Sequence, residues 1–74
     1  MPISTLGENI RRWRKTQGLS QKDVVLALGQ EQVNLSQYEH NARVPSLKNL
    51  ARLAMALQVS ILDLLEGTEY LERK

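Results

Sequence analysis

Hydrophobic residues recur along most of the chain at intervals of three and four residues, the spacing that gathers them on one face of an α-helix. Leu6, Ile10 and Trp13 follow this pattern near the start, and Val24 and Leu28 repeat it after a polar stretch. The pattern predicts helices at about 5–16, 20–28, 31–39 and 47–57, and a further helix from residue 60 to about residue 67. The residues expected in the core-facing stripes are Leu6, Ile10, Trp13, Val24, Leu28, Leu35, Tyr38, Leu47, Leu50, Leu53, Ala54, Leu57, Ile61 and Leu64.

Capping residues mark the ends of these predicted helices. A hydroxyl residue followed three positions later by an acidic residue predicts a capping box, and the pairs are Thr5 with Glu8, Ser20 with Asp23, and Ser60 with Asp63. Ser46 is the expected N-cap of the fourth helix, and Pro45 prevents the preceding helix from continuing. Gly29 and Asn41 tolerate the left-handed conformation that ends a helix, so the second and third helices are expected to stop there.

The second and third predicted helices are joined at Gly29, and two short helices around a glycine turn form the helix-turn-helix pattern. The outward arc of the third helix is rich in amides and carries no lysine or arginine. Side-chain amides can pair with N6 and N7 of adenine in the major groove, and a valine can contact a thymine methyl group. The residues expected to read bases are Gln32, Val33, Asn34 and Gln37. An ordinary polar helix surface is the alternative that this arc alone leaves open.

Three short motifs follow one another in a spacing typical of one protein family. They are Gly18-Leu19-Ser20-Gln21, then Ser36 followed by Glu39, then Pro45-Ser46-Leu47. With these motifs, the chain from about residue 6 to residue 67 resembles the lambda-repressor/Cro-like helix-turn-helix proteins, also called the XRE family. The resemblance implies an all-α fold, a compact five-helix DNA-binding domain, with double-stranded DNA as the partner and no cofactor. Asn41 and Gln58 stand where the family usually has glycine, and Leu62 stands where it usually has a polar residue.

The resemblance also implies roles for single side chains. Arg14 is expected to form an ion pair with Glu39 and so to pin the first helix to the third. Gln21 lies in the first turn of the second helix, where free backbone N–H groups favour a phosphate. The resemblance gives Gln21 a contact to the DNA backbone or to a base edge, and an exposed glutamine is the alternative. The other expected phosphate contacts are Ser36, Arg43 and Lys48. A local cap is the alternative for Ser36, and a solvated helix turn is the alternative for Lys48.

Length and composition limit the remaining possibilities. The chain has 74 residues, which predicts one domain over residues 1–74, with a core at about 5–67 and a short tail at 68–74. It contains no cysteine and a single histidine, so neither a disulfide nor a metal site is expected. No apolar run approaches the roughly 20 residues of a membrane span, and no apolar signal segment follows Met1. A cytoplasmic location without membrane contact is therefore expected.

Charge is distributed unevenly along the chain. Residues 1–52 carry eight basic and four acidic side chains, whereas residues 53–74 carry two basic and four acidic ones. The basic part contains the predicted DNA-reading helices, as a polyanionic partner requires. The pattern favours a sequence-specific transcriptional regulator, a repressor of phage or bacterial type. A helical protein-interaction module, or an antitoxin that mainly binds a partner protein, is the alternative that Glu31, Leu26 and Leu62 support. An enzyme is not expected, because no paired carboxylates or nucleophile–base pair appears.

Hydrophobic residues crowd the last predicted helix. They cover more of its circumference than one short helix can bury against its own core. The resemblance implies that Ile61 and Leu64 face that core, because the family places apolar residues at these positions. The surplus predicts a homodimer whose contact surface contains Leu62, Leu65, Tyr70 and Leu71. The alternative is that Leu62 and Leu65 only seal the end of a small domain.

Overall fold

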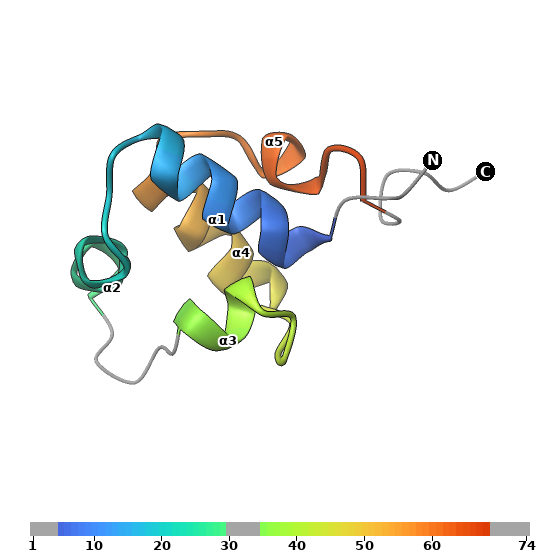
Figure 1. Cartoon of the computed structure of the whole chain (residues 1–74), viewed down its shortest axis with the longest axis horizontal. Coiled ribbons are helices and arrows are strands. Elements are labelled where there is room, and N and C mark those ends of the chain that lie inside the picture. Colours follow the sequence, from blue (N-terminus) through green and yellow to red (C-terminus); the bar gives the residue numbers. More distant parts are fainter. Residues whose placement is uncertain (1–4, 30–34, 69–74) are drawn as a thin grey trace.

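The computed structural model describes residues 5–29 and 35–68, and these residues form five α-helices and no β-strand. The helices are α1 (Leu6–Thr16), α2 (Gln21–Leu28), α3 (Leu35–Glu39), α4 (Leu47–Leu57) and α5 (Ile61–Leu65). α1 packs against α3, α4 and α5, and α2 packs against α3 and α4. Figure 1 shows α1 in front of α4, with α5 and α3 on opposite sides of this pair and α2 at one end. The predicted all-α, five-helix architecture is confirmed.

Local capping chemistry fixes the starts of the helices. The capping boxes at Thr5, Ser20 and Ser60 are all present, with each hydroxyl accepting from the N3 backbone N–H. In the second box, the Ser20 backbone N–H donates to the Asp23 carboxylate over 2.9 Å. This bond, together with the one to the Ser20 side chain, lowers the pKa of Asp23 below its ordinary value of 3.8. The contribution of this cap to stability is therefore present at neutral pH and is lost as the pH falls through that lowered pKa.

Among the described residues, left-handed conformations occur at the predicted helix ends Gly29 and Asn41, and also at Gly18, Gln58 and Gly67. Gly29 ends α2 with φ 68°, and Asn41, just beyond α3, has φ 62°. Gln58 ends α4 with φ 63°, although it carries a Cβ. Its N–H bonds to the carbonyls of Ala54 and Met55. Two positions where the family usually has glycine thus keep the glycine-like backbone with a longer side chain.

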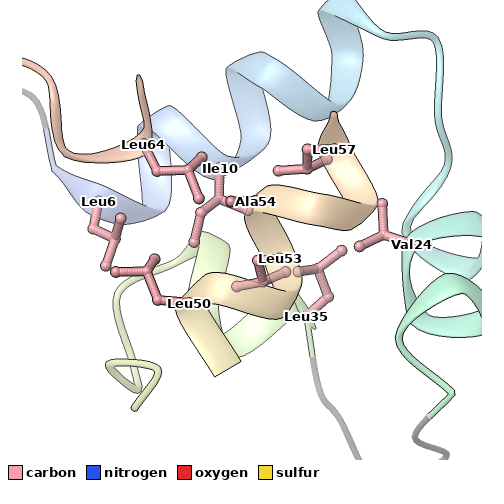
Figure 2. Close-up of a cluster of buried hydrophobic side chains, with 9 residues drawn as sticks. All are labelled: Leu6, Ile10, Val24, Leu35, Leu50, Leu53, Ala54, Leu57 and Leu64. Carbon is pink, nitrogen blue, oxygen red and sulfur yellow. The ribbon is translucent and has the colours of Figure 1, made fainter. Parts of the chain in front are cut away.

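A core of nine buried hydrophobic side chains draws on all five helices, as Figure 2 shows. They are Leu6, Ile10, Val24, Leu35, Leu50, Leu53, Ala54, Leu57 and Leu64. Trp13, Leu28, Tyr38 and Ile61, which were also predicted to face inward, are partly buried and pack against this cluster. Leu47 was wrongly placed in the core: it is 75% exposed. Its spacing matches the apolar face, but it lies in the first turn of α4, at the edge of the packed region.

Two details at the C-terminal end differ from the predicted boundaries. α5 ends at Leu65 rather than near Gly67. The sequence predicts that Thr68 belongs to the tail, but Thr68 is buried and its hydroxyl donates to the Leu65 carbonyl. The turn after α5 therefore folds back onto the domain instead of leaving it.

Side-chain amides in α1 and just after it bind backbone carbonyls at the ends of two other helices. Asn9 is fully buried, and its amide Nδ2 donates to the carbonyls of Leu64 at 2.7 Å and Glu66 at 2.8 Å. Gln17, just after α1, donates from Nε2 to the Leu57 carbonyl at the end of α4, over 2.9 Å. The last carbonyls of a helix have no partner within the helix, so these amides satisfy groups that burial would otherwise leave unpaired.

Candidate nucleic-acid interface

α2, the Gly29 turn and α3 are held against the rest of the domain by one buried residue from each helix. Val24 of α2 is fully buried, and Leu35 at the start of α3 is 2% exposed. Residues 30–34, which join the two helices, lie outside the described part of the chain. Three of the four residues predicted to read bases, Gln32, Val33 and Asn34, are among them, so their placement stays a prediction.

An ion pair fixes the C-terminal end of α3 to α1. Arg14 Nε donates to Glu39 Oε2 over 2.6 Å, and Arg14 Nη2 donates to Oε1 over 3.2 Å. The side chains are only 12% and 2% exposed, respectively. The third donor of the guanidinium, Nη1, binds the Leu19 carbonyl over 2.9 Å. One guanidinium therefore joins α1, the turn before α2 and the end of α3, and this is the pair that the family resemblance implied.

The same carboxylate also orients Gln21, the predicted phosphate contact in the first turn of α2. Gln21 Nε2 donates to Glu39 Oε1 over 3.1 Å. A side-chain amide has two N–H donors and one carbonyl acceptor, so this bond occupies one donor of a half-buried side chain. The second N–H is the group that a phosphate would accept from.

A second attachment between α1 and α3 was not predicted from the sequence. The backbone N–H of Gly7 donates to Asn41 Oδ1 over 3.0 Å, and Asn41 Nδ2 donates to Thr5 Oγ1 over 3.0 Å. Gly7 lies so close to α3 that a Cβ there would be 2.5 Å from the Tyr38 carbonyl oxygen and 2.6 Å from that of Glu39. A glycine inside a predicted helix lowers the helix propensity and often indicates close packing against another element. Gly7 was therefore the sequence signal from which this attachment could have been predicted.

The outward side of α3 combines an amide with a local hydroxyl–imidazole contact. Gln37 is half-buried on this helix. Ser36 Oγ lies 3.3 Å from His40 Nδ1, which is also 2.8 Å from the Ser36 carbonyl oxygen. The Ser36 hydroxyl thus has a local partner within α3 and the following turn, the alternative that the sequence left open. It still has lone pairs and a rotatable proton for a further contact.

The two predicted cationic phosphate contacts are exposed on the segment that follows α3. Arg43 lies in the loop between α3 and α4, and Lys48 lies in the first turn of α4. Tyr38 joins these elements, because its hydroxyl accepts from Asn49 Nδ2 over 3.3 Å. Both cations are therefore presented on a backbone that is tied to α3.

The predicted dimer surface is partly described. Leu62 is 63% exposed, whereas Leu65 is half-buried and packs against the core. Leu64 and Ile61 lie toward the core, as the sequence predicted. Tyr70 and Leu71 lie outside the described residues. Leu65 thus contributes to sealing the domain, and Leu62 is the described member of the set that projects from it.

Residues 5–29 and 35–68 lack two further kinds of feature. None of the helices in these ranges is long and apolar enough to cross a membrane. No three His, Cys, Asp or Glu side chains in the same ranges are grouped so that they could hold a metal ion.

A five-helix bundle in which Gly29 ends α2 in the left-handed conformation, and in which a buried ion pair attaches α3 to α1, defines a lambda-repressor-like helix-turn-helix protein. The chain matches the helix-turn-helix family HTH_3 over residues 10–64 and belongs to that family. It is 38% identical over 64 residues to the HTH-type transcriptional regulator y4dJ of Sinorhizobium fredii, a match covering 86% of this chain and 83% of y4dJ.

Solved structures show the same fold. The P22 c2 repressor, crystallised with a synthetic operator, is 36% identical, with a TM-score of 0.76 over 86% of this chain and 97% of that one. The restriction-modification controller C.AhdI of Aeromonas hydrophila is 30% identical, with a TM-score of 0.74 over 80% of this chain and 89% of that one.

Proposed function

We propose that the protein is a sequence-specific, double-stranded-DNA-binding transcriptional repressor that binds a near-palindromic operator as a dimer. The observation that carries this proposal is the double attachment of α3 to α1, by Arg14–Glu39 and by Gly7–Asn41. Reading bases requires side chains held at a fixed position on the duplex, and sites on rigid elements hold position best. The P22 c2 repressor with its synthetic operator and SinR with DNA are similar proteins solved on DNA.

The contacts divide into two kinds. Gln21, Ser36, Arg43 and Lys48 bind phosphates and set the register of the domain, whereas Gln32, Val33, Asn34 and Gln37 read base edges. Support for this division comes from chemistry: the described members of the first set offer cationic or hydrogen-bonding groups around α3, and Gln37 offers an amide on α3 itself.

Replacing Gln37 and Arg43 is expected to have different effects on binding. Gln37→Ala should weaken the preferred operator by roughly 1–3 kcal/mol and relax the preference at one base pair, because an amide–adenine pair is lost. Arg43→Ala should weaken all sequences about equally and lower the salt slope by about one, because one phosphate contact is lost. Selection of sites from random duplexes, followed by gel shifts at several salt concentrations, measures both effects. Lys15→Ala, an exposed cation on α1, is the control. An unchanged selected sequence for Gln37→Ala would argue that α3 does not read bases.

The dimer is proposed because one recognition helix reads only a few base pairs, too few for specificity in a genome. Two copies related by a two-fold axis would read half-sites about 34–36 Å apart. The exposed Leu62 is the described residue best placed to contact the second copy.

Leu62→Glu is expected to convert the dimer to a monomer, because it puts a carboxylate into an apolar contact. Sedimentation at micromolar concentration measures the change, with and without a symmetric operator. Leu26→Glu is the matched control, because Leu26 is a leucine of similar exposure on another helix, at 68% against 63%. Wild-type protein that stays monomeric in both conditions would contradict the dimer.

A further inference from the structure

A hollow lies between the C-terminal halves of α2 and α4. Its volume is about 550 Å³, and it is lined by Ala27, Leu28, Arg52, Met55, Ala56 and Gln58. Figure 1 shows α2 at one end of the molecule, beside the end of α4. The proposed function assigns no contact to these residues, and the proposed dimer surface lies on α5.

Four of the six lining residues are apolar, and two of these four, Ala27 and Met55, are exposed. Met55 is 79% exposed, and Leu26, the neighbour of Ala27, is 68% exposed. Ala27 and Ala56 are small, so another backbone can approach closely between α2 and α4. Methionine side chains adapt their shape to an apolar partner, which is why they are common on surfaces that bind helices. The size and composition of the hollow therefore suit one or two inserted aliphatic side chains.

Arg52 gives the hollow a positive charge. It contributes the only charged group of the lining, and no hydrogen bond or ion pair involves it within the described ranges. Arginine is the cation best suited to pairing with a carboxylate at a protein contact, because its planar fork binds both oxygens. An apolar hollow with one unpaired arginine complements an aliphatic side chain next to an acidic one.

We propose that this α2–α4 hollow binds an amphipathic helix of a partner protein, through aliphatic side chains that enter between Leu28 and Met55 and an acidic residue that pairs with Arg52. Helices recognised in this way present their anchors at intervals of three and four residues. Because Leu62 does not line the hollow, such a partner could bind the dimer.

A second copy of this chain is a less suitable occupant. One acidic, apolar helix in the described part of the chain is α5, which has only five residues. Leu64 is buried in its own core, and Ile61 and Leu65 pack against that core, so Leu62 alone projects. Docking α5 into the hollow of another copy would be a head-to-tail contact, which builds open filaments unless its rotation closes a ring.

The test uses two synthetic helical peptides of about 15 residues, the length at which isolated helices become stable. Both carry leucines on one face; one has glutamates beside them and the other has lysines. Each peptide is titrated into the isotope-labelled full chain and followed by NMR. The glutamate peptide should shift the amides of Leu28, Arg52, Met55 and Ala56, and the lysine peptide should bind at least about tenfold more weakly.

Reversing the charge at position 52 distinguishes a specific ion pair with Arg52 from general electrostatic attraction between peptide and protein. Arg52→Glu should exchange the preference, so that the lysine peptide binds better than the glutamate peptide. Arg12→Glu, the same charge change at an exposed position of α1, should leave the preference unaltered. Thermal unfolding of each variant checks that the fold is retained.

Three outcomes would overturn the proposal. The first is a set of shifts centred on Leu62 instead of the hollow. The second is the same shifts on concentrating the protein without peptide, which would identify a second copy as the occupant. The third is an absence of peptide binding together with a loss of DNA affinity in Arg52→Gln, which would make Arg52 a phosphate contact one turn beyond Lys48.

Discussion

Arg14→Ala is expected to lower the free energy of unfolding by about 3 kcal/mol or more, the usual cost of removing one partner from a buried ion pair. Glu39 is 2% exposed, so its carboxylate would lose its countercharge without regaining water. Gln21 would remain as its side-chain donor among the contacts described above. A domain of this size has a total stability of only about 4–11 kcal/mol. The variant should therefore be substantially unfolded at temperatures that the wild type tolerates.

Urea unfolding followed by circular dichroism measures this loss. Arg12→Ala is the matched control, because Arg12 is an exposed arginine of the same helix, and its removal should change stability by less than about 0.5 kcal/mol. Replacing both members of the pair, as in Arg14→Met with Glu39→Leu, should recover much of the loss, since no buried charge is left unpaired. A loss below about 1 kcal/mol in Arg14→Ala would reduce the pair to a surface contact.

Gly7→Ala is expected to destabilise the protein by about 2 kcal/mol, in the range for overpacking a close contact. The added Cβ would be 2.5 Å and 2.6 Å from two backbone carbonyl oxygens of α3. Backbone atoms cannot rotate away as a side chain can, so α1 and α3 would have to separate. The same separation would lengthen the Gly7–Asn41 hydrogen bond.

The sign of the change in unfolding free energy distinguishes close packing from ordinary helix propensity. Alanine is ordinarily favoured over glycine in a helix by about 1 kcal/mol. Arg11→Ala and Arg11→Gly, at an exposed position of α1, measure that ordinary preference in the same helix. If Gly7→Ala proves as stabilising as alanine is at position 11, the two helices are not in close contact. Its DNA affinity should fall together with its stability, since α3 moves.

Local chemistry explains which parts of the fold could be predicted. A capping box needs only residues three positions apart, so the starts of α1, α2 and α5 were predicted correctly from the sequence. Leu47 was misplaced because periodicity gives the face of a helix but not how far the packed region extends along it. Asn9 donates hydrogen bonds to two carbonyls near the end of α5, and these residues are more than 50 positions apart in the sequence. Rules based on short spacings do not predict contacts at such a separation.

The candidate nucleic-acid interface likewise contains one attachment that was predicted and one that was not. The Arg14–Glu39 pair was expected because the chain resembles a family, and nothing in the spacing of residues 14 and 39 would have indicated it. The Gly7–Asn41 attachment was missed because it depends on how closely two helices approach. Even so, each of its residues carried a local signal: a glycine inside a helix and an asparagine at a helix end.

Gly7 and Asn9, which each form a hydrogen bond to another part of the domain, lie on the same turn of α1. Gly7 binds the segment at the end of α3, and Asn9, two residues later, binds the last carbonyls of α5. One turn of helix is only about 5.4 Å long. One turn of α1 thus connects α5, which carries Leu62, to α3, which carries Gln37. A displacement of α5 would act through the Asn9 side chain on the turn of α1 whose Gly7 N–H binds the segment at the end of α3.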